Sequence, residues 1–284
     1  IVVLRRYARN SRENIDRPIA EMKYMQQKVV EMAKSVDQLM GYEGNAARIY
    51  FRTLGKLIDP EFAFTGRNRR PPLDPFNSML SLGYSIILNE IYGKLEGKGL
   101  NPYFGMLHQD REKHPTLASD MMEEWRAVLV DTTVMGILNG HELSVDDFYS
   151  EENKLGVFLS DRAFKIYLKK LEEKFRSDNK YLSYVDYSVS FRKALDLQVN
   201  QLAKMLETGD LTLYKPVAFE GLRLFDLYRW KELDKAVANI ENERTMYGLA
   251  YEARKFNGER DYVWPLPTAE LDTNKKLVQH DLWK

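Results

Sequence analysis

The stretch "PTLASDMMEEWRAVLVDTTVMGILNG", residues 115–140, decides how this chain folds. It predicts one helix, with Thr116 as a possible N-cap, Gly140 as the stop, and Trp125 able to turn toward a core. An acidic group occupies the same helix, which raises the question of whether it is a solvated face or a set of metal ligands. The group consists of Asp120, Glu123 and Glu124.

Asp120 and Glu123 are three residues apart and share a helix face, and His108 precedes them in a connecting segment. Hard divalent cations such as Mg²⁺ and Mn²⁺ prefer carboxylate oxygens, and imidazole broadens a site toward Mn²⁺. Glu43 is the best candidate for a third element, since it starts a helix and flanking glycines let backbone approach closely. The alternative is structural, because the helix dipole favours acids in a first turn and a lone histidine is more often structural.

Outward from this stretch the chain is mostly helical, with few strand signals. Gly41 and Gly44 interrupt the first long apolar pattern. A loop rich in proline, residues 63–75, ends where Asp74 is a plausible N-cap with Pro75 at the first helical position. The other predicted helices span residues 16–44, 43–58, 74–99, 161–176 and 190–207.

Composition limits the possible functions. The 284 residues suffice for one or two domains, and 44% hydrophobic with 30% charged residues is typical of a globular protein. Lys+Arg and Asp+Glu both total 42, so only local charge can indicate a nucleic-acid partner. Without cysteine, any metal must be held by His and carboxylates. No apolar run approaches the ~20 residues of a membrane span, and a cytoplasmic location is compatible with these features.

A basic cluster precedes the predicted helix at 74–99, with six Lys and Arg residues against two acids. Guanidinium groups suit bidentate phosphate contacts, although a short basic cluster is more commonly a solvated surface. Beside a carboxylate metal site the cluster indicates phosphodiester chemistry, in which a metal activates an oxygen nucleophile and stabilises the leaving oxygen. Its members are Arg48, Arg52, Lys56, Arg67, Arg69 and Arg70.

Four collinear segments are "MGYEGNAARIYF", "RNRRPPLDPFNSMLSLGYSIIL", "GLNPYFGMLH" and "TLASDMMEEWRAVLVD". They resemble the helical catalytic lobe of the CRISPR-associated adaptation integrases, which insert new spacers into CRISPR arrays. The resemblance runs from about Leu4 to Val217. It implies a mainly α fold, with a helical DNA integrase and nuclease domain at residues 1–218 that lacks the family's usual N-terminal β domain.

The same resemblance implies the site. Glu43, His108 and Glu123 match the family's catalytic metal ligands for Mg²⁺ or Mn²⁺, and Asp120 is the neighbouring acid of that metal motif. The implied reaction is attack of a DNA 3′-hydroxyl on a phosphodiester, with metal-dependent nicking at the same site. Implied partners are double-stranded DNA, a second copy of the chain and a small ferredoxin-like protein, and no membrane. The predicted DNA-binding residues are Arg48, Arg52, Arg67, Arg69, Arg70, Asn77 and Tyr84.

The tail, residues 219–284, departs from that family. "GLRLFDLYRWKELDKAVANI" predicts a C-terminal helix, and the Pro-interrupted remainder predicts irregular structure. With "DYVWPLPTAELDTNKKLVQHDLW", it resembles the C-terminal end of the SusD/RagB-type nutrient-binding lipoproteins. Two alternatives to the integrase therefore stay open: a glycan-binding protein of the nutrient-uptake type, and an inactive integrase fragment.

Overall fold

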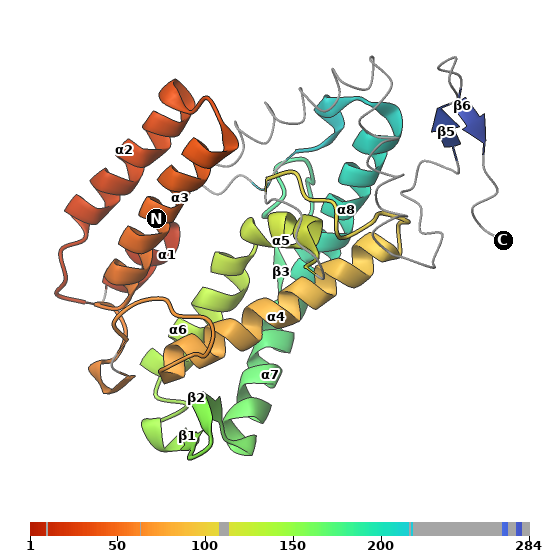
Figure 1. The fold of residues 1–284 in the computed structure, drawn as a ribbon. Coiled ribbons are helices and arrows are strands. Elements are labelled where there is room, and N and C mark those ends of the chain that lie inside the picture. Colours follow the sequence, from red (N-terminus) through yellow and green to blue (C-terminus); the bar gives the residue numbers. More distant parts are fainter. Residues whose placement is uncertain are drawn as a thin grey trace.

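The computed structural model describes residues 1–9, 11–62, 64–107, 114–215, 217, 269–271 and 277–279, and Figure 1 shows its ribbon. Helices dominate the described residues, as the sequence predicted. None of these helices is both long and apolar enough to cross a membrane. In chain order they are α1 (Val2–Ala8), α2 (Asp16–Met32), α3 (Val36–Leu54), α4 (Pro75–Glu96), α5 (Thr116–Glu123), a π-helical turn (Ala127–Asp131), α6 (Thr132–Asn139), α7 (Asp161–Arg176) and α8 (Phe191–Thr208).

Three short antiparallel strand pairs accompany the helices, and the sequence did not predict them. In the first pair Phe148 lies opposite Leu159, with an irregularity in the register between Tyr149 and Glu151. The third pair falls in the tail, so the expectation of an irregular tail is wrong there, while the predicted helix at 221–240 lies outside the described residues. The strands are β1 (Phe148–Glu151), β2 (Lys154–Leu159), β3 (Asp178–Asn179), β4 (Val189–Ser190), β5 (Ala269–Leu271) and β6 (Leu277–Gln279).

The break between the first two long helices is not where the glycines predicted it. Ala33 is extended, with φ −69° and ψ 114°, and Ser35 caps α3 by accepting a hydrogen bond from the amide of Gln38 at 3.3 Å. Serine at an N-cap satisfies a backbone donor that the helix leaves free. Gly41 and Gly44 therefore lie inside α3, and Glu43 stands in its middle rather than at its start.

The acidic stretch also differs from the single helix that was predicted. It divides into α5, the π-helical turn and α6, with Gly140 ending α6 as expected. In the π-helical turn the amide of Thr132 bonds to the carbonyl of Ala127, five residues earlier. Thr116 is not the N-cap; it lies in the first turn and its hydroxyl donates to the carbonyl of Tyr103.

The cap of α4 is confirmed. Asp74 accepts a hydrogen bond from the amide of Asn77 at 2.7 Å, and Pro75 occupies the first turn, where its missing N–H costs nothing. Helices α7 and α8 also match their predicted ranges to within a residue. The apolar side of α4 is fully buried, at Phe76, Met79, Leu80, Ile87, Ile91 and Leu95.

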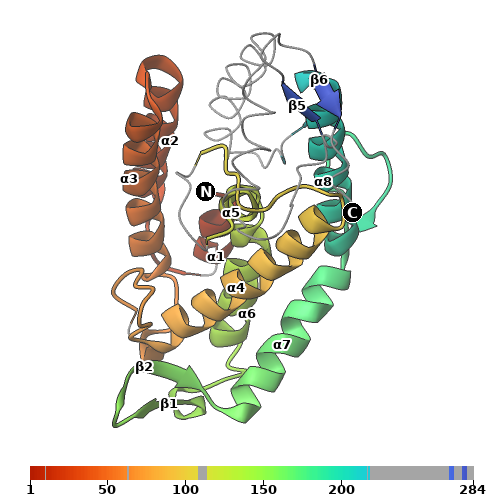
Figure 2. The same cartoon turned by 45° about the vertical axis from the view of Figure 1, so that its right-hand side comes forward.

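Two hydrophobic cores divide the described part of the chain. The main core joins α1, α4, α5, α6, α7 and α8 around the fully buried Trp125 and Tyr167, and α2 and α3 reach it through Ile19, Phe51 and Leu54. Figures 1 and 2 show α2 and α3 side by side, as a pair that stands beside this body. The far end of the pair has a small core of its own, made of Val29, Ala33, Leu39 and Leu107.

Candidate active site

Two of the predicted metal ligands meet at one arginine. Glu43 comes from α3 and Glu123 ends α5, and the guanidinium of Arg126 lies between their carboxylates. Nη2 of Arg126 is 3.6 Å from Glu43 Oε1 and 2.7 Å from Glu123 Oε2. Nη1 donates to Glu123 Oε1 at 2.8 Å. The side chains of Glu43, Glu123 and Arg126 are 15%, 8% and 16% exposed, so this carboxylate centre is largely removed from water.

The carboxylate centre lines a cavity of about 180 Å³, together with residues that come mainly from α1, α3 and the π-helical turn. Burial by itself would lower the pKa of Arg126, but the negative charges of Glu123 and Glu43 raise it above the ordinary arginine value. The guanidinium is therefore firmly charged, and it neutralises one of the two carboxylates. The three side chains together carry one net negative charge.

Asp120 faces a different partner from Glu123, although both lie on one side of α5. It is fully buried, and its Oδ2 accepts hydrogen bonds from the amides of Met106 and Leu107 at 2.5 and 2.9 Å. Asp120 thereby fixes the backbone that leads directly into residue 108. This contact favours a positioning role for Asp120 over the predicted role of a metal ligand.

Leu107 ties the same segment to the opposite side of the centre. It is 4% exposed and packs with Leu39 in the small core of the α2–α3 pair. Glu43 follows Leu39 by four residues on α3, and residues four apart share a helix face. The backbone before residue 108 is thus held both by the helix of Glu123 and by the helix of Glu43.

His108 itself lies outside the described residues. Among the residues that are described, no group of three or more acidic or histidine side chains is arranged to hold a metal ion. The donors that do meet fit a hard divalent cation, because both are carboxylates. Glu123 Oε2 is also buried and accepts no hydrogen bond within the described part of the chain. A metal set completed by His108 stays a prediction.

Glu124, next to the centre, has a structural role. It is 8% exposed, and its carboxylate accepts hydrogen bonds from Gln198 Nε2 at 2.6 Å and from the hydroxyl of Tyr214 at 2.9 Å. The amide of Val217 donates to the same carboxylate at 2.9 Å. These donors come from α8 and from the segment after it, so Glu124 fastens that part of the chain to α5.

A buried carboxylate behind the centre links three elements. Asp131 ends the π-helical turn, is 1% exposed, and accepts hydrogen bonds from the hydroxyls of Tyr50 at 2.7 Å and Tyr84 at 2.6 Å. Burial raises the pKa of Asp131, and burial together with Asp131 raises the pKa of both tyrosines. Tyr84, predicted near DNA, thus uses its hydroxyl to join α4 to this turn.

Two more of the predicted DNA-binding residues turn inward. Asn77 is fully buried and donates to the carbonyl of Gly66 at 2.8 Å. Arg67 donates to Asn77 Oδ1 at 2.8 Å and to Ser81 Oγ at 3.1 Å, and it lies 5.3 Å from the ring centre of Tyr84. These bonds fasten the loop after residue 63 onto α4. The interior position of Asn77 corrects the expectation that its side chain contacts DNA.

The other four predicted DNA-binding arginines are exposed. Arg48 and Arg52 lie on α3, Arg69 and Arg70 lie in the loop, and none of them forms an ion pair with another described residue. The β1–β2 hairpin braces that loop, since the amide of Val157 donates to the carbonyl of Pro72 at 2.8 Å.

Three polar residues of this region were missed by sequence analysis: Tyr50, Arg126 and Asp131. The spacing rule that paired Asp120 with Glu123 also places Arg126 one step further, three residues after Glu123. Arg126 could therefore have been found. Asp131 could not, because the π-helical turn changes the residue spacing after Trp125.

Fold and site together define a helical domain with a buried carboxylate centre and an arginine-bearing surface. The family model described as CRISPR associated protein Cas1 matches residues 1–173. CRISPR-associated endonuclease Cas1 of Mycobacterium tuberculosis is 41% identical over 180 residues, 63% of this chain and 53% of the relative. CRISPR-associated endonuclease Cas1 2 of Rhodospirillum rubrum is 38% identical over 201 residues, 70% of this chain and 58% of the relative.

Solved structures agree with these relatives. A chain of a Cas6-RT-Cas1–Cas2 complex gives a TM-score of 0.67 and 30% identity, over 77% of this chain and 24% of that one. A casposase bound to its integration product gives a TM-score of 0.60 at 22% identity, over 75% of this chain and 66% of the casposase, and shares the fold. The chain belongs to the CRISPR-associated protein Cas1 family.

The family covers only part of the chain, and the chain covers only part of its relatives. It spans about half the length of the curated relatives that it matches. Residues 217–283 match a second family model, that of the SusD family. Most of that second match lies outside the described residues.

Proposed function

We propose that this chain forms the catalytic lobe of a metal-dependent DNA endonuclease and integrase of CRISPR adaptation. The observation that carries the proposal is the meeting of Glu43 and Glu123 at one largely buried point. The backbone leading into His108 is tied to both of their helices, through Asp120 and through Leu107. Family membership supports the same conclusion, since curated relatives are named endonucleases.

Glu43, Glu123 and His108 would hold a divalent cation, Mg²⁺ or Mn²⁺. A bound ion of this kind activates an oxygen nucleophile and stabilises the leaving oxygen of a phosphodiester. The protein's own contribution is to hold the carboxylates in a site with little water, where charge interactions are stronger than at the surface. Asp120 contributes by positioning the backbone of residues 106 and 107. The acceptor is a phosphodiester, and the nucleophile is a DNA 3′-hydroxyl or water.

We propose double-stranded DNA as the main partner. Exposed Arg48 and Arg52 on α3, the helix of Glu43, and exposed Arg69 and Arg70 in the loop would contact its phosphates. A second copy of the chain and a small ferredoxin-like protein complete the proposed assembly. The titles of two similar structures name Cas1–Cas2 complexes, which supports a partner of that kind.

The comparisons do not favour the glycan-binding alternative. The SusD-type match covers only residues 217–283, while the Cas1 match covers residues 1–173. The inactive-lobe alternative makes a separate prediction, namely binding of a metal ion without nicking or strand transfer. Measuring both Mn²⁺ binding and DNA nicking therefore tells an active lobe from an inactive one.

A calorimetric titration tests the metal site. The chain is expected to bind one Mn²⁺, and His108→Ala and Glu43→Gln are each expected to abolish measurable binding, because each removes a donor. Glu21→Gln is the matched control, since Glu21 is an acid on α2 that pairs at the surface with Arg17. Circular dichroism checks that the variants keep their helices. If His108→Ala binds Mn²⁺ as tightly as the parent, the site is wrongly assigned.

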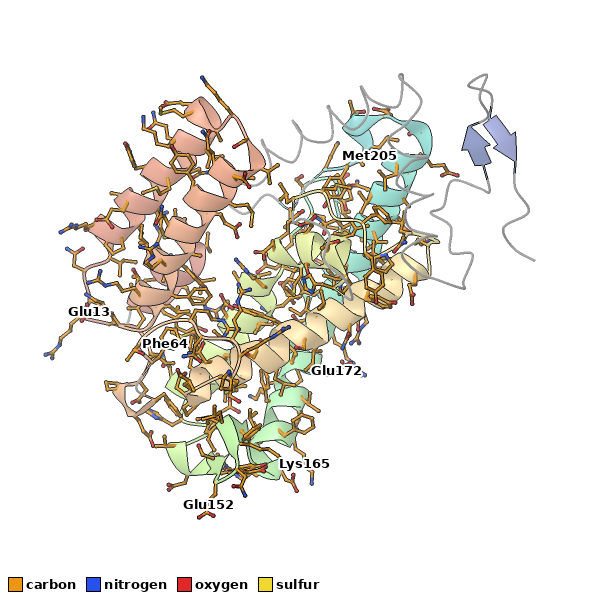
Figure 3. The ribbon with its side chains drawn as sticks, viewed as in Figure 1. Glu13, Phe64, Glu152, Lys165, Glu172 and Met205 are labelled. Atoms are coloured by element: carbon orange, nitrogen blue, oxygen red, sulfur yellow. The ribbon has the colours of Figure 1, made fainter. Side chains whose placement is uncertain are left out.

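Replacing Arg69 and Arg70 together by Ala is expected to weaken DNA binding at every sequence. The salt dependence, log K against log[salt], should become shallower by about two units at most, at ~0.9 per phosphate contact. Lys165→Ala with Lys169→Ala is the control, because these exposed lysines lie on α7, whose Lys165 end is remote from the α2–α3 pair (Figure 3). An unchanged salt slope would remove the loop from the DNA surface.

A further inference from the structure

Arg126 lies between Glu43 and Glu123, where the proposed function places a divalent cation. Its Nη2 atom contacts Glu43 Oε1 and Glu123 Oε2, at 3.6 and 2.7 Å. These are oxygens of the two acids that the proposed function assigns to a divalent cation. One cationic group therefore already occupies the space between them, and its side chain is only 16% exposed.

A divalent cation and a guanidinium that contact the same two carboxylates repel each other, so each lowers the affinity of the site for the other. Metal ligation requires oxygens within about 2.0–2.6 Å of the ion, depending on the metal. Arg126 now takes up both oxygens of Glu123, one through a hydrogen bond at 2.8 Å and one through an ion pair at 2.7 Å. An ion bound to Glu123 therefore weakens this pairing with Arg126.

The forked guanidinium has a second suitable partner in the proposed reaction. Arginine binds carboxylate and phosphate in the same bidentate manner, so a phosphodiester can replace the carboxylates as its partner. Two other acids of this region already have hydrogen-bond partners. Asp131 already accepts hydrogen bonds from two tyrosine hydroxyls, and Asp120 holds two backbone amides.

Resting on the proposed function, we propose that Arg126 competes with the divalent cation for the carboxylates of Glu43 and Glu123, and that a DNA phosphate relieves this competition. Binding of DNA then raises the affinity for the ion, and binding of the ion raises the affinity for DNA by the same factor. Arg126 is in this view a residue that couples the two ligands. A simple structural role, in which Arg126 only joins α3 to α5, predicts the opposite effect of its removal on the ion.

The test is Mn²⁺ calorimetry on the parent chain and on Arg126→Gln, with and without a DNA duplex. Without DNA, Arg126→Gln should bind Mn²⁺ about tenfold more tightly than the parent, within the usual range of coupling between two ligands. Adding DNA should tighten Mn²⁺ binding to the parent by more than it does in the variant. Equal or weaker Mn²⁺ binding by Arg126→Gln would overturn the proposal.

Arg192→Gln is the matched control. Arg192 also bridges two glutamates, Glu90 at 3.0 Å and Glu172 at 2.8 Å; it lies on α8, and neither glutamate is a proposed metal ligand. Its removal should leave the affinity for Mn²⁺ unchanged. Arg126→Lys retains the positive charge, so its affinity for Mn²⁺ without DNA should stay close to that of the parent.

Arg126→Gln can lose its fold, because it removes the positive charge that lies between the carboxylates of Glu43 and Glu123. In that case Mn²⁺ should restore the helical circular-dichroism signal of Arg126→Gln, and a variant that stays unfolded in Mn²⁺ would overturn the proposal. Failure of the proposed function gives a different result. If neither the parent nor folded Arg126→Gln binds Mn²⁺, the metal site itself is wrong; if the parent binds and the variant gains nothing, only the competition is wrong.

Discussion

Glu123→Gln is expected to reduce metal-dependent nicking of DNA by on the order of 10³-fold, because the metal contributes several kcal/mol of transition-state stabilisation. The substitution keeps the shape of the side chain but removes the charge that a divalent cation needs. The side chain of Glu123 is hydrogen-bonded only to Arg126 among the described residues, so little of the fold depends on its carboxylate. Cleavage rates on a supercoiled plasmid with Mn²⁺ measure the effect.

The neighbouring acid provides the control for this prediction. Glu124→Gln should keep its nicking activity at a temperature where it is folded, and it should lose about 1–3 kcal/mol of unfolding free energy, because a charged acceptor of three hydrogen bonds is replaced. The two adjacent substitutions thus separate activity from stability. Full nicking activity in Glu123→Gln would contradict the proposed site whatever Glu124→Gln does.

Gly83→Ala is expected to destabilise the chain by about 2–4 kcal/mol, through overpacking and a lost buried hydrogen bond. A Cβ atom at this position in α4 would lie 2.1 Å from the hydroxyl oxygen of Tyr167 and 2.6 Å from a methyl carbon of Val130. Tyr167 is fully buried and donates to the carbonyl of Met79 at 3.0 Å, so it cannot move aside without breaking that bond. Urea unfolding measures the free energy.

Gly93→Ala, in the same helix, should raise the free energy of unfolding where Gly83→Ala lowers it. Apart from its chain neighbours and the backbone of its own helix, no described atom lies within 4 Å of the position that its Cβ would take. Alanine has a higher helix propensity than glycine, so the substitution should stabilise the chain by about 0.5–1 kcal/mol. A similar loss of stability in both variants would mean that α4 does not pack against the π-helical turn and α7 as the structure has it.

The sequence predicted the helices best where apolar spacing and a cap signal agreed. Asp74 and Pro75 predicted the start of α4, and both predictions are confirmed. Gly41 and Gly44 predict a break, but the tertiary packing of α3 outweighs their low helix propensity, and the chain turns at Ala33 and Ser35 instead. Local propensity is a weak guide when a helix is stabilised mainly by its packed face.

The site was predictable only in part, because residue spacing describes a single helix. Spacing identified Asp120 and Glu123 as neighbours on α5, but it could not tell that one faces a backbone turn and the other faces Glu43. Spacing within one helix says nothing of what a second helix brings to that face. The basic cluster shows a similar limit, since Arg67 and Arg69 are two residues apart, yet one is bound to α4 and the other is exposed.

The position of Leu107 has a consequence for how this chain opens locally. Leu107 belongs to the small core of the α2–α3 pair, while its amide is held by Asp120 of α5. The pair therefore cannot separate from the body without either losing Leu107 from its core or breaking the bonds to Asp120. The Leu107 amide should therefore exchange together with the α2–α3 amides only where opening of the pair breaks the bonds to Asp120. In either case, opening of the pair separates Glu43 on α3 from Glu123 on α5.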